Sequence, residues 1–127
     1  MCQNWGYKRL YKRVRDESID EMKHADQVIE RILFLEGVPN MQRYSKVQVG
    51  ETVKEQLELD LQLEYSAIAF LNQGIQACRD AKDNATEDLM TRILVSEEEH
   101  TDWLESQLEL IRQVGEQNYL SQQIKED

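Results

Sequence analysis

Two Glu-x-x-His motifs carry the residues of this sequence that are best suited to chemistry. The first contains Glu21 and His24, and the second contains Glu97 and His100. Residues three positions apart are neighbours on a helix, so the carboxylate and the imidazole of each motif can reach one common atom. A buried carboxylate is costly unless it is paired or bound to a metal ion. The repeated motif therefore predicts a metal site shared by two helices.

A third carboxylate, that of Glu64, is expected at the same level of the helices. Apolar residues recur every three or four positions, and Glu21, Glu64 and Glu97 fall within these apolar stripes. Each also lies near the middle of its helix, so side-by-side packing would bring the three carboxylates to about one depth. Carboxylate oxygen and imidazole nitrogen suit iron, manganese or zinc, and bridging carboxylates can hold two ions. The alternative is a buried polar layer without metal, in which each histidine pairs with a glutamate.

An all-α fold is predicted to position these groups, as a single domain over residues 1–127. Apolar periodicity predicts three long helices and a short C-terminal helix, at residues 8–36, 52–80, 85–114 and 116–125. Gly37 and Gly115 provide helix stops. The segment 38–50 lacks a helical period and is long enough to run along the bundle, so we expect the first two long helices to be parallel. The short turn at 82–84 predicts an antiparallel arrangement of the next two.

The composition limits the classes of partner that this protein can have. With 25 acidic and 15 basic residues, the net charge is −10, which weighs against nucleic acid and suits a protein that attracts cations. No apolar run approaches the roughly 20 residues of a membrane span, and the first residues form no apolar signal region. Two cysteines are too few for a disulfide framework. We therefore expect a cytoplasmic protein that binds neither nucleic acid nor membrane.

With its motifs placed, the sequence closely resembles bacterioferritin. The resemblance rests on residues 16–26 and 29–37 around the first motif, on residues 96–105 around the second, and on residues 115–120 near the end. It implies a ferritin-like four-helix bundle that forms a homo-oligomeric cage of 24 subunits. It further implies a ferroxidase that oxidises Fe(II), stores and detoxifies iron as a ferric mineral, and carries haem b at two-fold interfaces.

The resemblance also implies a role for each residue of the two motifs. Glu21 and Glu97 would bridge a pair of iron ions. His24 would bind one of these ions, and Glu64 and His100 would bind the other. The resemblance therefore turns the predicted metal site into a di-iron site.

Three further positions are interpreted through the same resemblance. Met22 would be an axial haem ligand, one from each of two subunits related by a two-fold axis. Asp20 would bind iron on the inner surface of the cage, whereas Asp16 stands where many members have a histidine. The family begins with another long helix that adds a carboxylate ligand, and this sequence begins where that helix should end. We therefore expect the first bundle helix to be missing and residues 1–7 to be its stub. Three explanations are left open: a truncated or wrongly started sequence, a separate chain that supplies the helix, or a degenerate subunit in a mixed cage. We favour a separate or lost N-terminal segment.

Three functions are left open by these observations. The first is a ferroxidase subunit of an iron-storage cage. The second is a haem-bearing or structural cage subunit with an incomplete iron site, which needs a partner chain for the missing helix. The third is a helical interaction module without metal.

Overall fold

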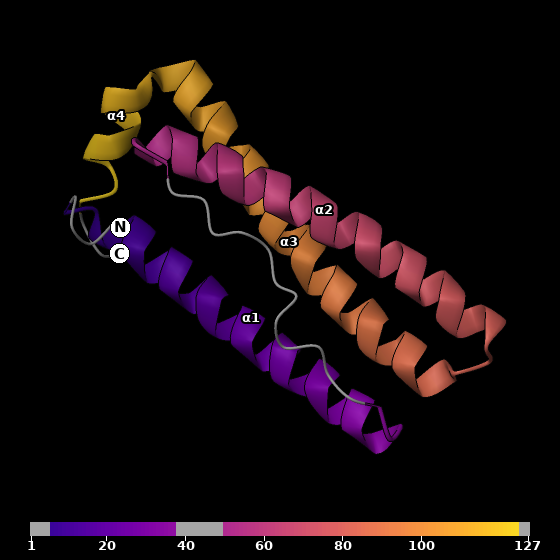
Figure 1. Cartoon of the computed structure of the whole chain (residues 1–127). Coiled ribbons are helices and arrows are strands. Elements are labelled where there is room, and N and C mark those ends of the chain that lie inside the picture. The colour runs from indigo at the N-terminus through magenta and orange to yellow at the C-terminus, as the bar shows by residue number, and fades with distance from the viewer. Residues whose placement is uncertain (1–5, 38–49, 125–127) are drawn as a thin grey trace.

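The computed structural model describes residues 6–37 and 50–124, and every regular element within these ranges is a helix. The helices are α1 (Lys8–Phe34), α2 (Val53–Asp80), α3 (Asn84–Val114) and α4 (Glu116–Ser121). Helices α2 and α3 lie side by side and antiparallel, α1 runs in the same direction as α2, and α4 lies near the beginning of α1 (Figure 1). The predicted all-α architecture of three long helices and one short helix is confirmed. None of the described helices is both long enough and apolar enough to cross a membrane.

The helices begin within one residue of the expected starts, but two of them end earlier than expected. Helix α1 ends at Phe34 rather than at residue 36, because Glu36 adopts the left-handed conformation with φ 63°. The N–H of Glu36 donates to the carbonyl of Leu33, and the N–H of Gly37 donates to the carbonyl of Ile32, which together form a Schellman motif. Helix α4 ends at Ser121 rather than at residue 125. The expected crossover at residues 38–49 lies outside the described part of the chain.

Helix α1 is attached to the rest of the bundle at both of its ends. In its first turn, the N–H of Arg9 donates to the carbonyl of Gln123, beyond α4, at 3.0 Å. In its last turn, Arg31 donates from Nε to Thr86 Oγ1 at 2.9 Å and from its terminal nitrogen to Asp83 Oδ1 at 3.2 Å. Asp83 is also the N-cap of α3, so this contact joins the end of α1 to the start of α3. The two attachments set the position of α1 along the bundle.

Two apolar clusters fill the bundle, one on each side of a polar layer. The larger cluster lies toward α4 and consists of Leu10, Val53, Leu57, Leu61, Leu104, Ile111 and Tyr119. The smaller cluster lies toward the turn between α2 and α3 and consists of Leu71, Leu89 and Ile93. Between the clusters, α2 contributes Glu64 and α3 contributes Glu97, and both residues are buried. Buried carboxylates at this level need either hydrogen-bond partners or a cation.

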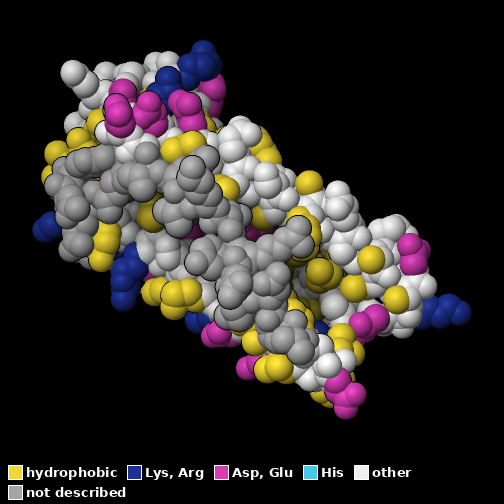
Figure 2. Space-filling view, viewed as in Figure 1, with side chains coloured by type: hydrophobic (Ala, Val, Ile, Leu, Met, Phe, Trp, Pro, Cys, Tyr) yellow, Lys and Arg dark blue, Asp and Glu magenta, His cyan; other side chains and the backbone are white. Residues whose placement is uncertain are grey.

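Large hydrophobic side chains also reach the outer surface of the described helices. The most exposed are Met22 at 65%, Phe34 at 72% and Phe70 at 68%. Figure 2 shows hydrophobic side chains coming to the surface toward the end of the bundle at which α1 and α2 finish. Large exposed apolar patches are typical of surfaces that bind a protein, a membrane or a ligand.

Candidate metal centre

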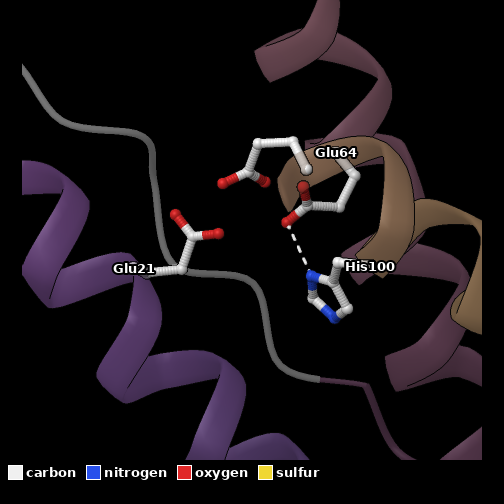
Figure 3. A group of neighbouring side chains, drawn as sticks. Glu21, Glu64 and His100 are labelled. Atoms are coloured by element: carbon white, nitrogen blue, oxygen red, sulfur yellow. Dashed lines mark ion pairs between the residues drawn. The ribbon is translucent and has the colours of Figure 1, made fainter. Parts of the chain in front are cut away.

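Three glutamates from three helices and one histidine converge in the polar layer. Glu21 comes from α1, Glu64 comes from α2, and Glu97 and His100 come from α3. Each residue offers one ligand atom, and these atoms all lie within 4.8 Å of one another. Figure 3 shows the carboxylate of Glu21 pointing from α1 toward Glu64 and His100. The structure therefore brings together four of the five ligands expected from the sequence, and we call them the four-residue group.

His24, the fifth expected ligand, lies beside the four-residue group rather than within it. Its Nδ1 is 3.5 Å from Oε1 of Glu97, and its side chain is 19% exposed. The second histidine, His100, has its Nδ1 3.2 Å from Oε1 of Glu64 (Figure 3). Among the five expected ligands there are thus two imidazole–carboxylate pairs, His24 with Glu97 and His100 with Glu64, and Glu97 also belongs to the four-residue group.

Several potential metal-ligand atoms of this layer have no hydrogen-bond partner among the described residues. These buried atoms are Nδ1 of His24, Nδ1 of His100, Oε2 of Glu64 and Oε2 of Glu97. An unsatisfied buried polar group costs about 1–3 kcal/mol, and more when it is charged. A divalent cation would satisfy these oxygen and nitrogen lone pairs together, because carboxylate and imidazole are the ligands that iron, manganese and zinc accept. The donor set therefore fits a cation centre.

Burial and mutual proximity raise the pKa of two acidic groups in the layer, those of Glu21 and Glu97. Burial is the largest cause that raises the pKa of Glu21 to about 8 and the pKa of Glu97 to about 7, and neighbouring carboxylates add to it. For His100, burial acts to lower the pKa, but the surrounding carboxylates, first Glu64, outweigh it and raise the pKa. Without a cation the layer therefore retains protons near neutral pH. A metal ion has to displace these protons when it binds.

Two acidic residues that were not among the expected ligands extend the layer, and each lies one helical turn from a ligand. Glu17 precedes Glu21 by four positions, and its Oε2 lies 3.9 Å from Nδ1 of His100. Asp60 precedes Glu64 by four positions, and burial is the main cause that raises its pKa. The i, i+4 spacing from the two expected ligands was the signal that could have identified both residues.

Two other expected site residues lie apart from the four-residue group. Met22 projects outward from α1, as its exposure shows. Asp20 lines a cavity of about 240 Å³ together with Lys23, His24 and Arg92. Asp20 thus lies in the same cavity as two cationic side chains, Lys23 and Arg92, and as His24 of the layer.

Comparison with known proteins relates the whole chain to one family. The family model for the ferritin-like domain matches residues 1–114. The chain is 46% identical over 122 residues to the bacterioferritin of Mycobacterium leprae, which covers 96% of this chain and 77% of that protein. It is 45% identical over 125 residues to the bacterial ferritin of Synechocystis sp., which covers 98% of this chain and 80% of that protein. It is 44% identical over 119 residues to the bacterioferritin of Brucella melitensis, an alignment that covers 94% of this chain and 74% of that protein. Each alignment extends over nearly the whole chain and so includes the helices that carry the four-residue group.

Proposed function

The chain belongs to the bacterioferritins within the ferritin-like family, and from this premise we propose that it stores iron and oxidises Fe(II) at its polar layer. The observation that carries the proposal is the convergence of ligand atoms from three helices within 4.8 Å of one another. The residues proposed to bind the substrate, Fe(II), are Glu21, His24, Glu64, Glu97 and His100. Buried donors without hydrogen-bond partners support the presence of a cation at this level.

The position of Glu97 supports the proposal that it bridges two ions. Its Oε1 contacts Nδ1 of His24, and the same residue belongs to the four-residue group with His100. A carboxylate shared in this way can contact two ions, one beside each histidine. Bound iron supplies the electrons that pass to an oxidant, while the chain supplies positions and negative charge. Fe(II) uptake releases protons from Glu21 and Glu97, because the pKa of each is raised.

We also propose that the chain assembles into a homo-oligomeric cage of 24 subunits that holds the ferric mineral. Exposed apolar residues on α1 support a contact between copies, since Met22 is 65% exposed and Leu33 is 58% exposed. These residues are eleven positions apart, about three helical turns, and so share one face of α1. Asp20 is proposed to bind iron on the inner surface of the cage. The single-domain organisation over residues 1–127 and the cytoplasmic location stay predictions.

Haem b is proposed at the contact between two copies, where Met22 would hold it. The exposed thioether of Met22 fits this role because it faces outward, where a second copy would present the same residue. Two thioethers would then hold one haem iron, which carries single electrons when it is bound. The chain's own contribution is to place a soft sulfur ligand on an apolar face of α1.

Rapid mixing of Fe(II) with the assembled protein in the presence of oxygen tests the ferroxidase proposal. Wild type and Glu98→Gln, which changes an exposed neighbour, are expected to show the same fast oxidation phase. Glu97→Gln is expected to lose this phase, because it removes a buried carboxylate from the group. Equal rates in all three proteins would remove the proposal.

The second candidate is a haem-bearing or structural cage subunit whose iron site needs a partner chain. The observation in its favour is that His24 lies outside the four-residue group and that its one described ion pair is with Glu97. A carboxylate from a separate chain, or from a segment outside the described residues, would complete its side of the centre. This candidate predicts a haem absorption band that Met22→Leu abolishes, together with slow iron oxidation. Native mass and the composition of the purified assembly would reveal such a chain, and a metal-free assembly would favour a helical interaction module instead.

A further inference from the structure

A carboxylate outside the four-residue group is held next to it by an arginine. Glu17 lies one turn before Glu21 on α1, and its side chain is 16% exposed. Its Oε1 accepts a hydrogen bond of 2.8 Å from Nε of Arg13, while its Oε2 lies 3.9 Å from Nδ1 of His100. The two oxygens of Glu17 thus face different partners, one cationic and one at the edge of the candidate centre.

Arg13 is itself kept in place by an aromatic ring. Its guanidinium carbon lies 4.7 Å from the ring centroid of Trp103, which is a cation–π distance. The ring of Trp103 in turn stacks on His100, with centroids 6.2 Å apart and an angle of 26° between the planes. Arg13, Glu17, His100 and Trp103 therefore form a closed circuit of contacts between α1 and α3.

We infer that Glu17 is an additional ligand for the ion bound by Glu64 and His100, and that Arg13 withholds it while no ion is present. This inference rests on the proposed function. Nδ1 of His100 is one of the buried atoms without a hydrogen-bond partner, and it is the atom from which Glu17 Oε2 is 3.9 Å away. An ion bound at the usual distance of about 2 Å from this nitrogen is within reach of Glu17 after rotation of its side chain.

The bound ion and the guanidinium of Arg13 compete for the carboxylate of Glu17, and the ion is expected to win. A divalent ion attracts the Glu17 carboxylate more strongly than the single charge of Arg13 does at a comparable distance. Arg13 keeps a partner after it loses Glu17, because its guanidinium still lies over the ring of Trp103. Glu17 would therefore move from the arginine to the ion without leaving an isolated buried charge.

Titration of the metal-free assembled protein with Co(II) tests this inference without iron turnover. Calorimetry gives the affinities, and the visible absorption of Co(II) reports its coordination number. Wild type and Glu30→Gln, which removes an exposed carboxylate from the same helix, are expected to bind two ions per subunit with the same spectrum. Glu17→Gln is expected to lower the affinity for one of the two ions about tenfold. It is also expected to intensify the visible absorption band of that ion, because fewer ligands surround it. Arg13→Gln is expected to raise the affinity for the same ion, because Arg13 no longer holds Glu17 away from it.

The outcomes separate this inference from the proposed function. If Glu17→Gln binds both ions with the affinity and spectrum of wild type, the inference is overturned and the proposed function stands. If Glu17→Gln and Arg13→Gln weaken binding equally, the pair merely stiffens α1 and the inference is overturned. If wild type binds no Co(II) and Glu97→Gln behaves like wild type, the proposed function and the inference about Glu17 both fail. Circular dichroism of each variant establishes that it is folded.

Discussion

The guanidinium of Arg31 in the last turn of α1 donates to Oδ1 of Asp83, the N-cap of α3, at 3.2 Å. Nε of the same arginine donates to Oγ1 of Thr86 in the first turn of α3. Hydrogen bonds from Thr86, together with Arg31, hold the pKa of Asp83 below its ordinary value. The contact therefore stays ionised over a wide range of pH and joins α1 to the helix that carries two of the proposed ligands.

Arg31→Gln is expected to weaken cation binding although it touches no ligand. The substitution releases the last turn of α1, so Glu21 and His24 are held less firmly against α3. We expect Co(II) affinity to fall a few-fold and the thermal midpoint to decrease slightly. Arg112→Gln is the control, because it removes an arginine whose ion pair with Glu109 is largely exposed and lies away from the polar layer. Equal effects of the two substitutions would show that the Arg31 contact has no special role.

The metal-free protein is expected to lose stability as the pH rises from about 5 to about 8. The pKa of Glu21 is about 8 and that of Glu97 about 7 in the folded protein, against an ordinary value of 4.5. In this window the folded chain binds more protons than the unfolded chain, so the free energy of unfolding falls with increasing pH. Thermal unfolding of the metal-free protein at several pH values measures the trend.

Substitution of one of these carboxyl groups provides the control for the pH dependence. Glu97→Gln cannot lose a proton at this position, so we expect a flatter profile. Saturating Co(II) should reverse the slope, because the ion binds the deprotonated carboxylates. A metal-free profile that rises between pH 5 and 8 would contradict the shifted pKa values.

Binding of Co(II) at His100 is expected to quench the fluorescence of Trp103. The two rings are stacked, with centroids 6.2 Å apart, and a paramagnetic ion on the imidazole would lie close to the indole. A Trp5→Phe variant isolates the emission of Trp103, and a titration of this variant should follow the occupancy measured by calorimetry. Unchanged emission at saturating Co(II) would place the ion away from His100.

Leu104→Ala is expected to destabilise the fold through a cavity in the larger apolar cluster. Leu104 is 1% exposed and packs between residues of three helices, so truncation should reduce the free energy of unfolding by about 2–5 kcal/mol. Leu110→Ala is the matched control, because Leu110 is 44% exposed on the same helix. Urea unfolding of both variants measures the difference, and similar losses would contradict the assignment of Leu104 to the core.

Helical periodicity was sufficient to predict that Glu21, Glu64, Glu97 and His100 lie together. Each glutamate falls within an apolar stripe near the middle of a long helix, and His100 lies beside one, so packing of the stripes brings the four side chains to one level. Periodicity could not predict that His24 lies beside the group. The i, i+3 spacing permits His24 and Glu21 to reach one atom, but the rotation of α1 about its axis decides whether they do, and that rotation depends on tertiary packing.

Contacts between distant parts of the chain account for the other differences. The circuit of Arg13, Glu17 and Trp103 joins two helices through side-chain orientations that no local pattern reveals. The end of α1 shows a similar limit, because Glu36 rather than Gly37 adopts the left-handed conformation. Space is tight at Gly37 instead, since a Cβ there would lie 3.0 Å from Cγ2 of Ile32 and one of the two would have to shift.

Helix α1 is attached at Arg9 and at Arg31, and its proposed ligands lie near its middle. A rod supported at its two ends deflects most easily at its centre, so we expect the distance from Glu21 to the other donors to be the most adjustable dimension of the layer. Small bends of α1 would then adjust the layer to ions of different radius. Discrimination among divalent metals would therefore depend on the chemistry of the donor atoms more than on the size of the space between the helices.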